Sequence, residues 1–517
     1  MVVQEEGCSS SSVTSSPLQS FSLMSLSPSG LTASPFGVGV GAGAGAASSP
    51  WVRELKSDER GLYLIHLLLN CANHVASGAL DHANSFLDTI SLLASPDGDT
   101  MQRIASYFTE ALARRILRSW PGLYRALCAS TPRLVAPAAE AAQARRHFLD
   151  LAPFLRLAFL VSNQAIIEAM DGEKMVHVID LSATAAAADP SQWLALLQAL
   201  SVRPEGPPHL RLTAVGEHRE ALAHMAGALS EEAEKLDIPF QFNPVVARLD
   251  ALDVASLRVK TGEALAISSV LQLHSLLASS SSSCGSSSSG EDVADRLPPA
   301  AAPPMGSSGS SSAAHLHSRM VGGSHKGQGG TLGELLEKDH HHANGFSPPS
   351  ADSGPLAPSA RMDGFLAALW GLSPKIMVVT EQESNHNGAA LSERFMEALN
   401  FYAALFDCLE STVARQSVER ARVEKLLFGE EINNIISCEG LERRERHERL
   451  ERWVRRLDGA GFGRVPLSYY GLLQARRMLQ NFGCEAYKVK EDSGCFMICW
   501  QDRPMYSVSA WRCRRYD

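Results

Sequence analysis

Apolar residues recur at helical spacing in the N-terminal third of the chain. The first stripe starts at Leu62 and stops at Gly78, a residue type that commonly ends helices, and two further stripes follow. The stretch 151–170 is apolar almost throughout, which is typical of a helix buried on all sides. The pattern predicts a helical cap over residues 60–172 that packs on a larger unit.

Beyond this cap, short apolar runs alternate with helical stretches. Such alternation is typical of an α/β fold with a parallel sheet. One helix has a clear start signal, because Asp189 suits its N-cap and Pro190 its first position. The predicted strands are residues 175–182, 210–216, 240–246, 263–271 and 375–382, followed by strand-like runs at 461–468, 484–502 and 506–512, with a hairpin turn at Lys490 to Gly494.

Two regions lack this periodicity. Residues 1–52 are rich in Ser, Gly, Ala and Pro, and residues 279–360 hold serine runs, a Pro-Pro pair and the triple histidine from His340 to His342. Neither region can bury enough apolar surface to offset the entropy of ordering, so we expect a disordered arm and a disordered insertion. A histidine tract can bind metal, but a solvated tract is the favoured interpretation.

Charged residues dominate the segment that follows a predicted long helical region at 391–427. Residues 441–458 carry an apolar stripe beside many Glu and Arg side chains. Opposite charges recur four residues apart, as in Glu442 and Arg446. The arginines alone would suggest nucleic-acid binding. The alternation of acidic and basic residues instead favours a charged helix with a solvated or partner-binding face.

Composition narrows the function classes. The chain has 517 residues, of which 45% are hydrophobic, and its net charge is −9. Because the chain is acidic overall, nucleic-acid binding would need a local basic patch. No apolar segment reaches the length that spans a bilayer, and the first basic residue is Arg53, which argues against a secretory signal. Ten scattered cysteines without zinc-finger spacing favour a reducing compartment, cytosolic or nuclear.

Candidate chemistry is sparse. The sequence has no nucleophile elbow, phosphate-binding loop or zinc-protease motif. Cys495 and Cys499 share one face of a predicted strand, where packed thiols are favoured over a metal or redox site. The stretch 380–386 gathers acids, Asn and His at a strand end, and an active site and a plain polar loop explain it equally well. We therefore expect no catalytic, cofactor or metal site.

Asp180 closes the first predicted strand, where a dinucleotide or S-adenosylmethionine fold places its ligand loop. Such a loop needs glycines, because its backbone approaches the ligand and adopts positive φ angles. No glycine occurs between Asp180 and Trp193. The sheet thus looks like that of a methyltransferase whose site has been lost, and we expect no binding of S-adenosylmethionine.

Five motifs in order resemble those of the GRAS family of plant transcriptional regulators. The run "VHVID" at 176–180 is similar to the central motif, and leucine-rich regions flank it. A Pro, an aromatic pair and a Glu match the next block, and an acidic-arginine stretch and a terminal "SVSAW" follow, so the resemblance covers 60–278 and 360–515. The motif positions, structural or partner-binding, are His177, Asp180, Trp193, Pro374, Phe401, Tyr402, Glu431, Arg443, Glu445, Arg446, Ser509, Ala510 and Trp511.

The resemblance implies a fold and a role. The fold is a Rossmann-like α/β core of the degenerate methyltransferase type over 173–278 and 360–515, with an N-terminal helical cap, inside a GRAS domain at 53–515. The role is that of a nuclear transcriptional co-regulator, not an enzyme and without a cofactor, in gibberellin-linked growth and root development. Implied partners are other GRAS proteins, DELLA-type regulators included, and INDETERMINATE-domain zinc-finger factors. The sequence departs from the family pattern in three places. Glu430-Glu431 stands in place of Arg-Glu, the segment after Leu181 is Ala-rich where relatives keep polar residues, and a DELLA-type N-terminal motif is lacking.

The first cap helix is a candidate partner surface, because its apolar residues leave little polar face. A helix that is apolar all round near a chain end is often buried against another chain. Leu64 and Leu68 are therefore predicted to lie at a contact between two GRAS proteins, in a homo- or heterodimer. Two alternatives stay open: sequence-specific DNA binding by a dimer and, less favoured, a residual S-adenosylmethionine-dependent methyltransferase.

Overall fold

The computed structural model describes residues 56–130, 138–182, 189–278, 356 and 359–514. The predicted arm, the triple histidine and nearly all of the predicted insertion lie outside these residues. The described helices are α2 (Ser57–Ser77), α3 (Leu80–Leu93), α4 (Thr100–Arg118), α5 (Pro121–Ser130), α6 (Ala138–Leu151), α7 (Phe154–Ala169), α8 (Ser191–Ser201), α9 (Arg219–Lys235), α10 (Ala360–Gly371), α11 (Leu391–Thr412), α12 (Val418–Val423), α13 (Glu430–Ser437), α14 (Leu450–Gly459) and α15 (Tyr469–Phe482).

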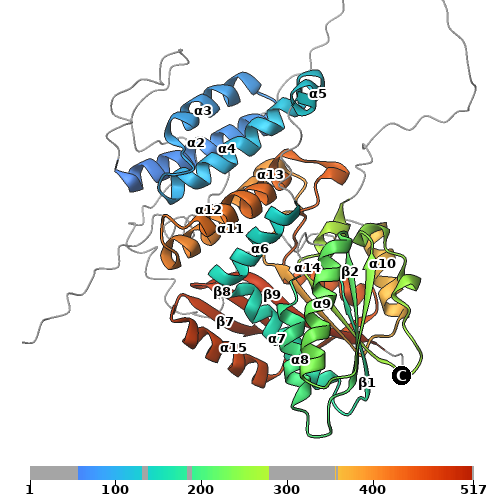
Figure 1. The fold of residues 1–517 in the computed structure, drawn as a ribbon. Helices are drawn as coiled ribbons and strands as arrows, with labels where there is room; N and C mark the ends of the chain where they lie inside the picture. Colours follow the sequence, from blue (N-terminus) through green and yellow to red (C-terminus); the bar gives the residue numbers. More distant parts are fainter. Residues whose placement is uncertain (1–55, 131–137, 183–188, 279–355, 357–358, 515–517) are drawn as a thin grey trace, which may run out of the picture. The chain divides into compact units, whose positions relative to one another are not determined.

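The predicted N-terminal helices are present, but they divide between two neighbourhoods (Figure 1). α2, α3 and α4 pack on one another, and α2 and α4 also pack on helices of the C-terminal half, α11 and α13. α7 instead lies against β5 and β9 of the sheet and against α8 and α15. Residues 60–172 are therefore not a separate bundle. Among the described residues, no single helix has the length and apolar character of a membrane span, and only the bent pair of Ala139–Leu151 with α7 meets both criteria.

Local signals explain where the first helices begin and end. Gly78 ends α2 with a left-handed φ of 76°, as its position in the sequence predicts. Asp99 caps α4 by accepting from the Gln102 backbone N–H at 3.0 Å, and the Gln102 side chain accepts in return from the Asp99 N–H. The same Asp99 carboxylate accepts from Arg60 at 2.7 Å, so the α4 cap also ties α4 to α2.

The sheet confirms the predicted α/β class. Its strand order is β3-β2-β1-β4-β5-β9-β8-β7, with β6 also paired to β9. β1 to β5 are parallel, and β9 lies antiparallel beside β5, as in a doubly wound, Rossmann-like sheet with an antiparallel extension. The strands are β1 (Met175–Asp180), β2 (His209–Gly216), β3 (Phe240–Val246), β4 (Ala264–Val270), β5 (Ile376–Gln382), β6 (Phe462–Val465), β7 (Tyr487–Asp492), β8 (Cys495–Trp500) and β9 (Arg503–Cys513).

Each face of the sheet is buried under its own layer of helices. Val176 and Val178 belong to the core that α7, α8 and α9 cover, whereas Ile179 belongs to the core under α10 and α14. Side chains alternate between faces along a strand, so two covered faces explain why β1, β2, β4 and β5 are buried at nearly every position. The fold therefore exposes the carboxyl edge of the parallel strands as the place for a site.

The C-terminal hairpin forms as predicted. β7 and β8 are joined by Ser493 and Gly494, both with positive φ (52° and 83°), the conformation that a tight antiparallel turn needs. Cys495 and Cys499 point to one face and are fully buried in a small apolar cluster, and burial raises the pKa of the Cys499 thiol to about 11. These contacts agree with packed, reduced thiols.

The charged helix predicted at 441–458 is wrong in its first half. A short 3-10 turn, Gly440–Glu442, is followed by an extended segment, and α14 starts only at Leu450. The cause is competition for backbone donors: the Asn434 side-chain oxygen accepts from the N–H groups of Arg444 (2.8 Å) and Glu445 (3.0 Å). These two N–H groups are therefore not available to a helix.

The long helical region predicted at 391–427 is longer and is interrupted. α11 ends at Thr412, and α12 begins after a short break. A π-helical turn, Glu424–Gly429, then leads into α13, so helical structure continues to Ser437.

Candidate functional site

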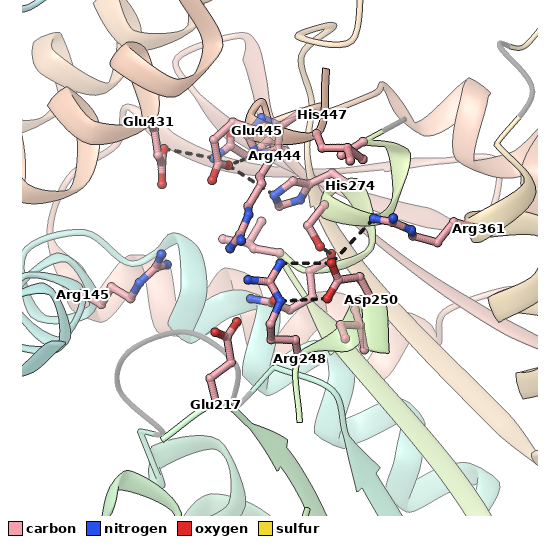
Figure 2. A pocket seen from close by; sticks show the side chains of 17 residues that line it. Arg145, Glu217, Arg248, Asp250, His274, Arg361, Glu431, Arg444, Glu445 and His447 are labelled. Carbon is pink, nitrogen blue, oxygen red and sulfur yellow. Dashed lines mark hydrogen bonds and ion pairs between the residues drawn. The ribbon is translucent and has the colours of Figure 1, made fainter. Parts of the chain in front are cut away.

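A polar pocket of about 400 Å³ lies at the carboxyl edge of the parallel strands. Segments at or just beyond the ends of β2, β3, β4 and β5 form its walls, and the extended segment before α14 closes it (Figure 2). Ligands bind at this edge in open α/β sheets, so the pocket is the candidate site. Its charged and ionisable lining residues are Arg145, Glu217, Arg248, Asp250, His274, Arg361, Glu431, Arg444, Glu445 and His447.

An ion-pair network forms one rim of this polar pocket. Arg248 donates to both carboxylate oxygens of Asp250, at 2.9 and 3.0 Å, and Arg361 of α10 lies 3.6 Å from the same carboxylate (Figure 2). The hydrogen bonds from Arg248 hold the pKa of Asp250 below its ordinary value. The rim charges thus satisfy one another and join the segment after β3 to α10.

Four residues, His274, Glu381, Glu445 and His447, form a His–Glu cluster at the floor. His274 Nδ1 lies 2.7 Å from Glu381 Oε2, and its Nε2 lies 3.2 Å from Glu445 Oε2. His447 Nε2 lies 3.3 Å from the same Glu445 oxygen. Glu381 is the penultimate residue of β5, His274 follows β4, and the other two belong to the extended segment. The fold therefore gathers the cluster from distant parts of the chain.

The cluster is strongly charged. Burial alone would lower the pKa of His274, but the Glu381 and Glu445 carboxylates raise it to about 10. Burial would raise the pKa of Glu445, yet the adjacent imidazoles of His274 and His447 hold it well below its ordinary value. Burial, together with the charge of His274, lowers the pKa of His447. One imidazole cation therefore lies between two carboxylates at neutral pH.

Residues from two family-like motifs meet behind this cluster. Tyr402 donates to Glu431 Oε2 at 2.8 Å, and the Gln382 amide lies 3.5 Å from the same oxygen. Burial, with repulsion from Glu445, raises the pKa of Glu431 to about 7. Phe401 packs edge-on against Tyr402 beneath them. Phe401, Tyr402, Glu431 and Glu445 are thus one structural group, which their separation in the sequence does not reveal.

Arg443 and Arg446 hold the extended segment in place rather than line the pocket. Arg443 donates to the His386 carbonyl at 2.9 Å. Arg446 donates to the Arg443 carbonyl at 2.9 Å and to the side chain of Asn387 at 3.0 Å. Both guanidinium groups are buried, so the predicted solvated face is wrong for Arg446, whereas Glu442 is exposed and pairs with Arg118 instead of Arg446.

The residues of the central motif make contacts internal to the fold. The Trp193 indole N–H donates to Asp180 Oδ2 at 2.9 Å, which ties α8 to β1. His177 accepts from Arg211 at Nδ1 and donates through Nε2 to Thr213 Oγ1, because the arginine can only donate. Burial lowers the pKa of His177 to about 3, so its imidazole is neutral. Residues 183–188, in the segment where a cofactor loop would follow Asp180, lie outside the described residues.

The remaining motif positions lie in the sheet, away from the polar pocket. Trp511 is fully buried on β9, as its strand-like pattern predicts, and its indole donates to Ser509 Oγ at 2.9 Å. Ala510 pairs opposite Val378 of β5, and the buried Pro374 precedes that strand. These positions support the core.

Sequence reasoning missed most of the His–Glu cluster. It singled out 380–386, which contains Glu381 and His386, but left an active site and a polar loop equally open. His274 is hidden in a Leu-x-x-Leu-Leu string that forms a buried 3-10 turn, and His447 stands in a charged run. No local signal marks either histidine as part of a site, because their partners lie far away along the chain.

The predicted partner surface at Leu64 and Leu68 is wrong. Both side chains are fully buried in the core that α2 shares with neighbouring helices of the same chain. The large apolar side chains exposed on the N-terminal helices lie elsewhere, and those around α5 are Trp120, Leu123 and Leu127, each between 47% and 49% exposed.

Comparisons with known proteins agree with the motifs. The model of the GRAS domain family matches residues 64–512. The chain is 57% identical over 515 residues to Scarecrow-like protein 3 of Arabidopsis thaliana, with 99% of each chain covered. It is 32% identical to DELLA protein GAI1 of Vitis vinifera, with 88% of this chain and 62% of that protein covered. The crystal structure of SCL7 in Oryza sativa matches with a TM-score of 0.63 at 26% identity, covering 87% of this chain and 99% of that one.

Proposed function

The chain belongs to the GRAS family of plant transcriptional regulators, and from this premise we propose that it acts in the nucleus as a co-regulator that binds other proteins. Its proposed partners are GRAS proteins, DELLA-type regulators included, and INDETERMINATE-domain zinc-finger factors that contact DNA in its place. The proposed pathway is gibberellin-linked growth and root development. The likeness to Scarecrow-like and DELLA relatives supports this proposal.

An exposed apolar face around α5 carries the protein-binding part of the proposal. Trp120, Leu123 and Leu127 are spaced by three and four residues, which places Leu123 and Leu127 on one side of α5 and Trp120 at its start. Each keeps close to half of its surface in water. Grouped apolar side chains of this kind on a soluble protein favour a contact with another protein, and aromatic anchors dominate such contacts. We assign this face to GRAS–GRAS association.

The hydrogen bonds that Asp180 accepts favour a protein-binding role for the chain over a catalytic one. In a cofactor-binding sheet this acid would face the ligand, but here it accepts hydrogen bonds from the Trp193 indole and the Ser182 backbone. The alanine-rich sequence after it supplies no glycine for the approach of a cofactor. Both features support the proposal that the sheet is a scaffold.

A matched pair of surface variants tests the proposal. Trp120, Leu123 and Leu127 are replaced together by Glu, and the control replaces Tyr469, Tyr470 and Leu473, three exposed residues of α15, in the same way. Co-precipitation with a DELLA-type partner should fail for the first variant only, while both melt like the parent chain. Unchanged binding by the first variant would contradict the assignment of this face.

A DNA titration separates the proposal from its main alternative. Purified chain should shift a promoter fragment only when an INDETERMINATE-domain factor is present. A shift by the chain alone, weakening steeply with salt and restricted to one sequence, would instead support direct DNA binding.

A further inference from the structure

We propose that His274, Glu445 and His447 bind a divalent transition-metal ion, zinc best of all, at the floor of the polar pocket (Figure 2). One imidazole nitrogen from each histidine and one carboxylate oxygen of Glu445 lie within 4.8 Å of one another. His274 follows β4, while the other two are separated by one residue in the extended segment. The site therefore exists only in the folded chain.

The spacing of the donor atoms fits tetrahedral zinc. Zinc binds nitrogen and oxygen ligands at about 2.0–2.1 Å, which separates neighbouring ligand atoms in a tetrahedron by about 3.3 Å. The Glu445 oxygen lies 3.2 Å from His274 Nε2 and 3.3 Å from His447 Nε2. Two of the three ligand-to-ligand distances thus already have the size that a bound ion requires.

His274 has the supporting contact that metal-binding histidines usually have. Its Nδ1 lies 2.7 Å from Glu381 Oε2, and the other oxygen of Glu381 accepts from the Leu273 backbone N–H at 2.9 Å. A carboxylate that holds one ring nitrogen fixes the ring, and the ion would replace the proton that the other nitrogen carries in the metal-free chain. Glu381 is therefore a positioning residue.

His447 supplies an independent observation. Its side chain is fully buried, and its Nε2 faces Glu445 Oε2 at 3.3 Å without the geometry of a hydrogen bond. Its Nδ1 lies 2.9 Å from Nδ1 of His386, whose Nε2 lies 2.9 Å from Ser384 Oγ. When His447 Nδ1 carries the proton for this contact, its Nε2 presents a lone pair toward Glu445. A buried nitrogen that faces a carboxylate without a good hydrogen bond is poorly satisfied, and a metal ion between the two atoms would bind both.

The donor set also indicates the kind of metal and of further ligand. Two imidazoles and a carboxylate are typical of zinc sites with an open fourth position, and imidazole disfavours Mg²⁺ and Ca²⁺. His274, Glu445 and His447 all line the polar pocket, so the open position faces its interior. Arg145, Arg248 and Arg444 line the same space, which favours water or an anionic group as the fourth ligand.

The test uses the full chain with His340, His341 and His342 changed to Ser in every sample, so that this tract cannot contribute. Metal-free protein is titrated with Zn²⁺ against a chelator. We expect one tight equivalent, affinity about 10–100-fold weaker for Glu381→Gln, and loss of that equivalent for His447→Gln and Glu445→Gln. His224→Gln, an exposed histidine of α9, is the control and should bind like the parent.

Folding is checked by circular dichroism for each variant. Tight binding that survives both His447→Gln and Glu445→Gln, or no tight binding by the parent, overturns the proposal. If those variants unfold, X-ray absorption at the zinc edge identifies the ligands of the ion in the zinc-loaded parent chain. Two imidazoles and an oxygen would support the site, whereas sulfur or a single imidazole would refute it. Partner capture through α5 should not depend on the metal, so this result and the proposed function can fail separately.

Discussion

The first helix and the charged stretch 441–458 both looked like partner surfaces in the sequence, and the structure buries much of both within the chain by different means. Leu64 and Leu68 of α2 are covered by apolar side chains of a shared core. In the charged stretch, Glu448 and Arg456 are buried together and bond through two N–H···O contacts, at 2.7 and 2.9 Å. A side chain is therefore buried when the chain supplies a matching contact, which is apolar packing for a leucine and an opposite charge for a glutamate.

The two kinds of interior respond differently to change. Apolar packing tolerates a substitution that keeps volume, because no single atom is essential. A buried ion pair does not, because removal of one charge leaves the other without compensation. Glu448 also accepts from Asn387 at 2.7 Å, so its carboxylate holds two segments at once. Four predictions test this contrast.

The largest effect is expected for Glu448→Gln. The amide keeps the shape but removes the buried carboxylate charge that pairs with Arg456, so the free energy of unfolding should fall by about 3–5 kcal/mol. Glu451→Gln, three positions away and exposed, is the matched control and should change it by less than about 0.5 kcal/mol. Urea unfolding measures both. Equal effects would show that burial of this charge is not what holds the segment.

A buried imidazole on β1 adds a pH test. The pKa of His177 is lowered from about 6.5 to about 3 by burial, so the unfolded chain takes up the proton first as pH falls. Stability from this group is complete above pH 6.5 and declines below it by about 1.4 kcal/mol per pH unit, or about 2 kcal/mol at pH 5. His177→Gln should remove that part of the slope in urea unfolding between these pH values. An unchanged slope would mean that the imidazole is protonated in the fold.

Periodicity predicted the elements that rest on apolar packing. The stop at Gly78, the five parallel strands and the hairpin before Cys495 all follow from local pattern and turn chemistry. These features depend on neighbours along the chain or on burial alone. The sequence could not show that α2 and α4 would pack on α11 and α13, because that contact joins distant segments.

The candidate site depends on contacts that no local pattern carries. His274 meets Glu381 across 107 residues, and His386 meets His447 across 61. The helix predicted through Glu445 failed because the Asn434 side chain takes two of its backbone donors. Side-chain competition of this kind overrides helical periodicity, and a single sequence gives no sign of it.

A smaller change in stability is expected for a volume-conserving substitution in the apolar core. Leu68→Met in α2 keeps the volume of a fully buried side chain, so it should lower the free energy of unfolding by less than about 1.5 kcal/mol. Leu68→Ala, which leaves a cavity, is the companion variant and should cost about 2–5 kcal/mol. Thermal and urea unfolding should rank the two in that order. If Leu68→Met lowered the free energy of unfolding as much as Leu68→Ala does, apolar packing in α2 would tolerate substitution no better than the buried ion pairs do.

The smallest effect is expected for Glu442→Gln, in the same charged stretch as Glu448. The Glu442 side chain is 58% exposed and pairs with Arg118, which also lies over the Tyr124 ring. Water and salt screen such a pair, so the free energy of unfolding should fall by less than about 1 kcal/mol, and less still at high salt. The Glu442 carbonyl, which accepts from Asn434, is untouched by the change. A loss near that of Glu448→Gln would show that charge itself, and not burial, governs this stretch.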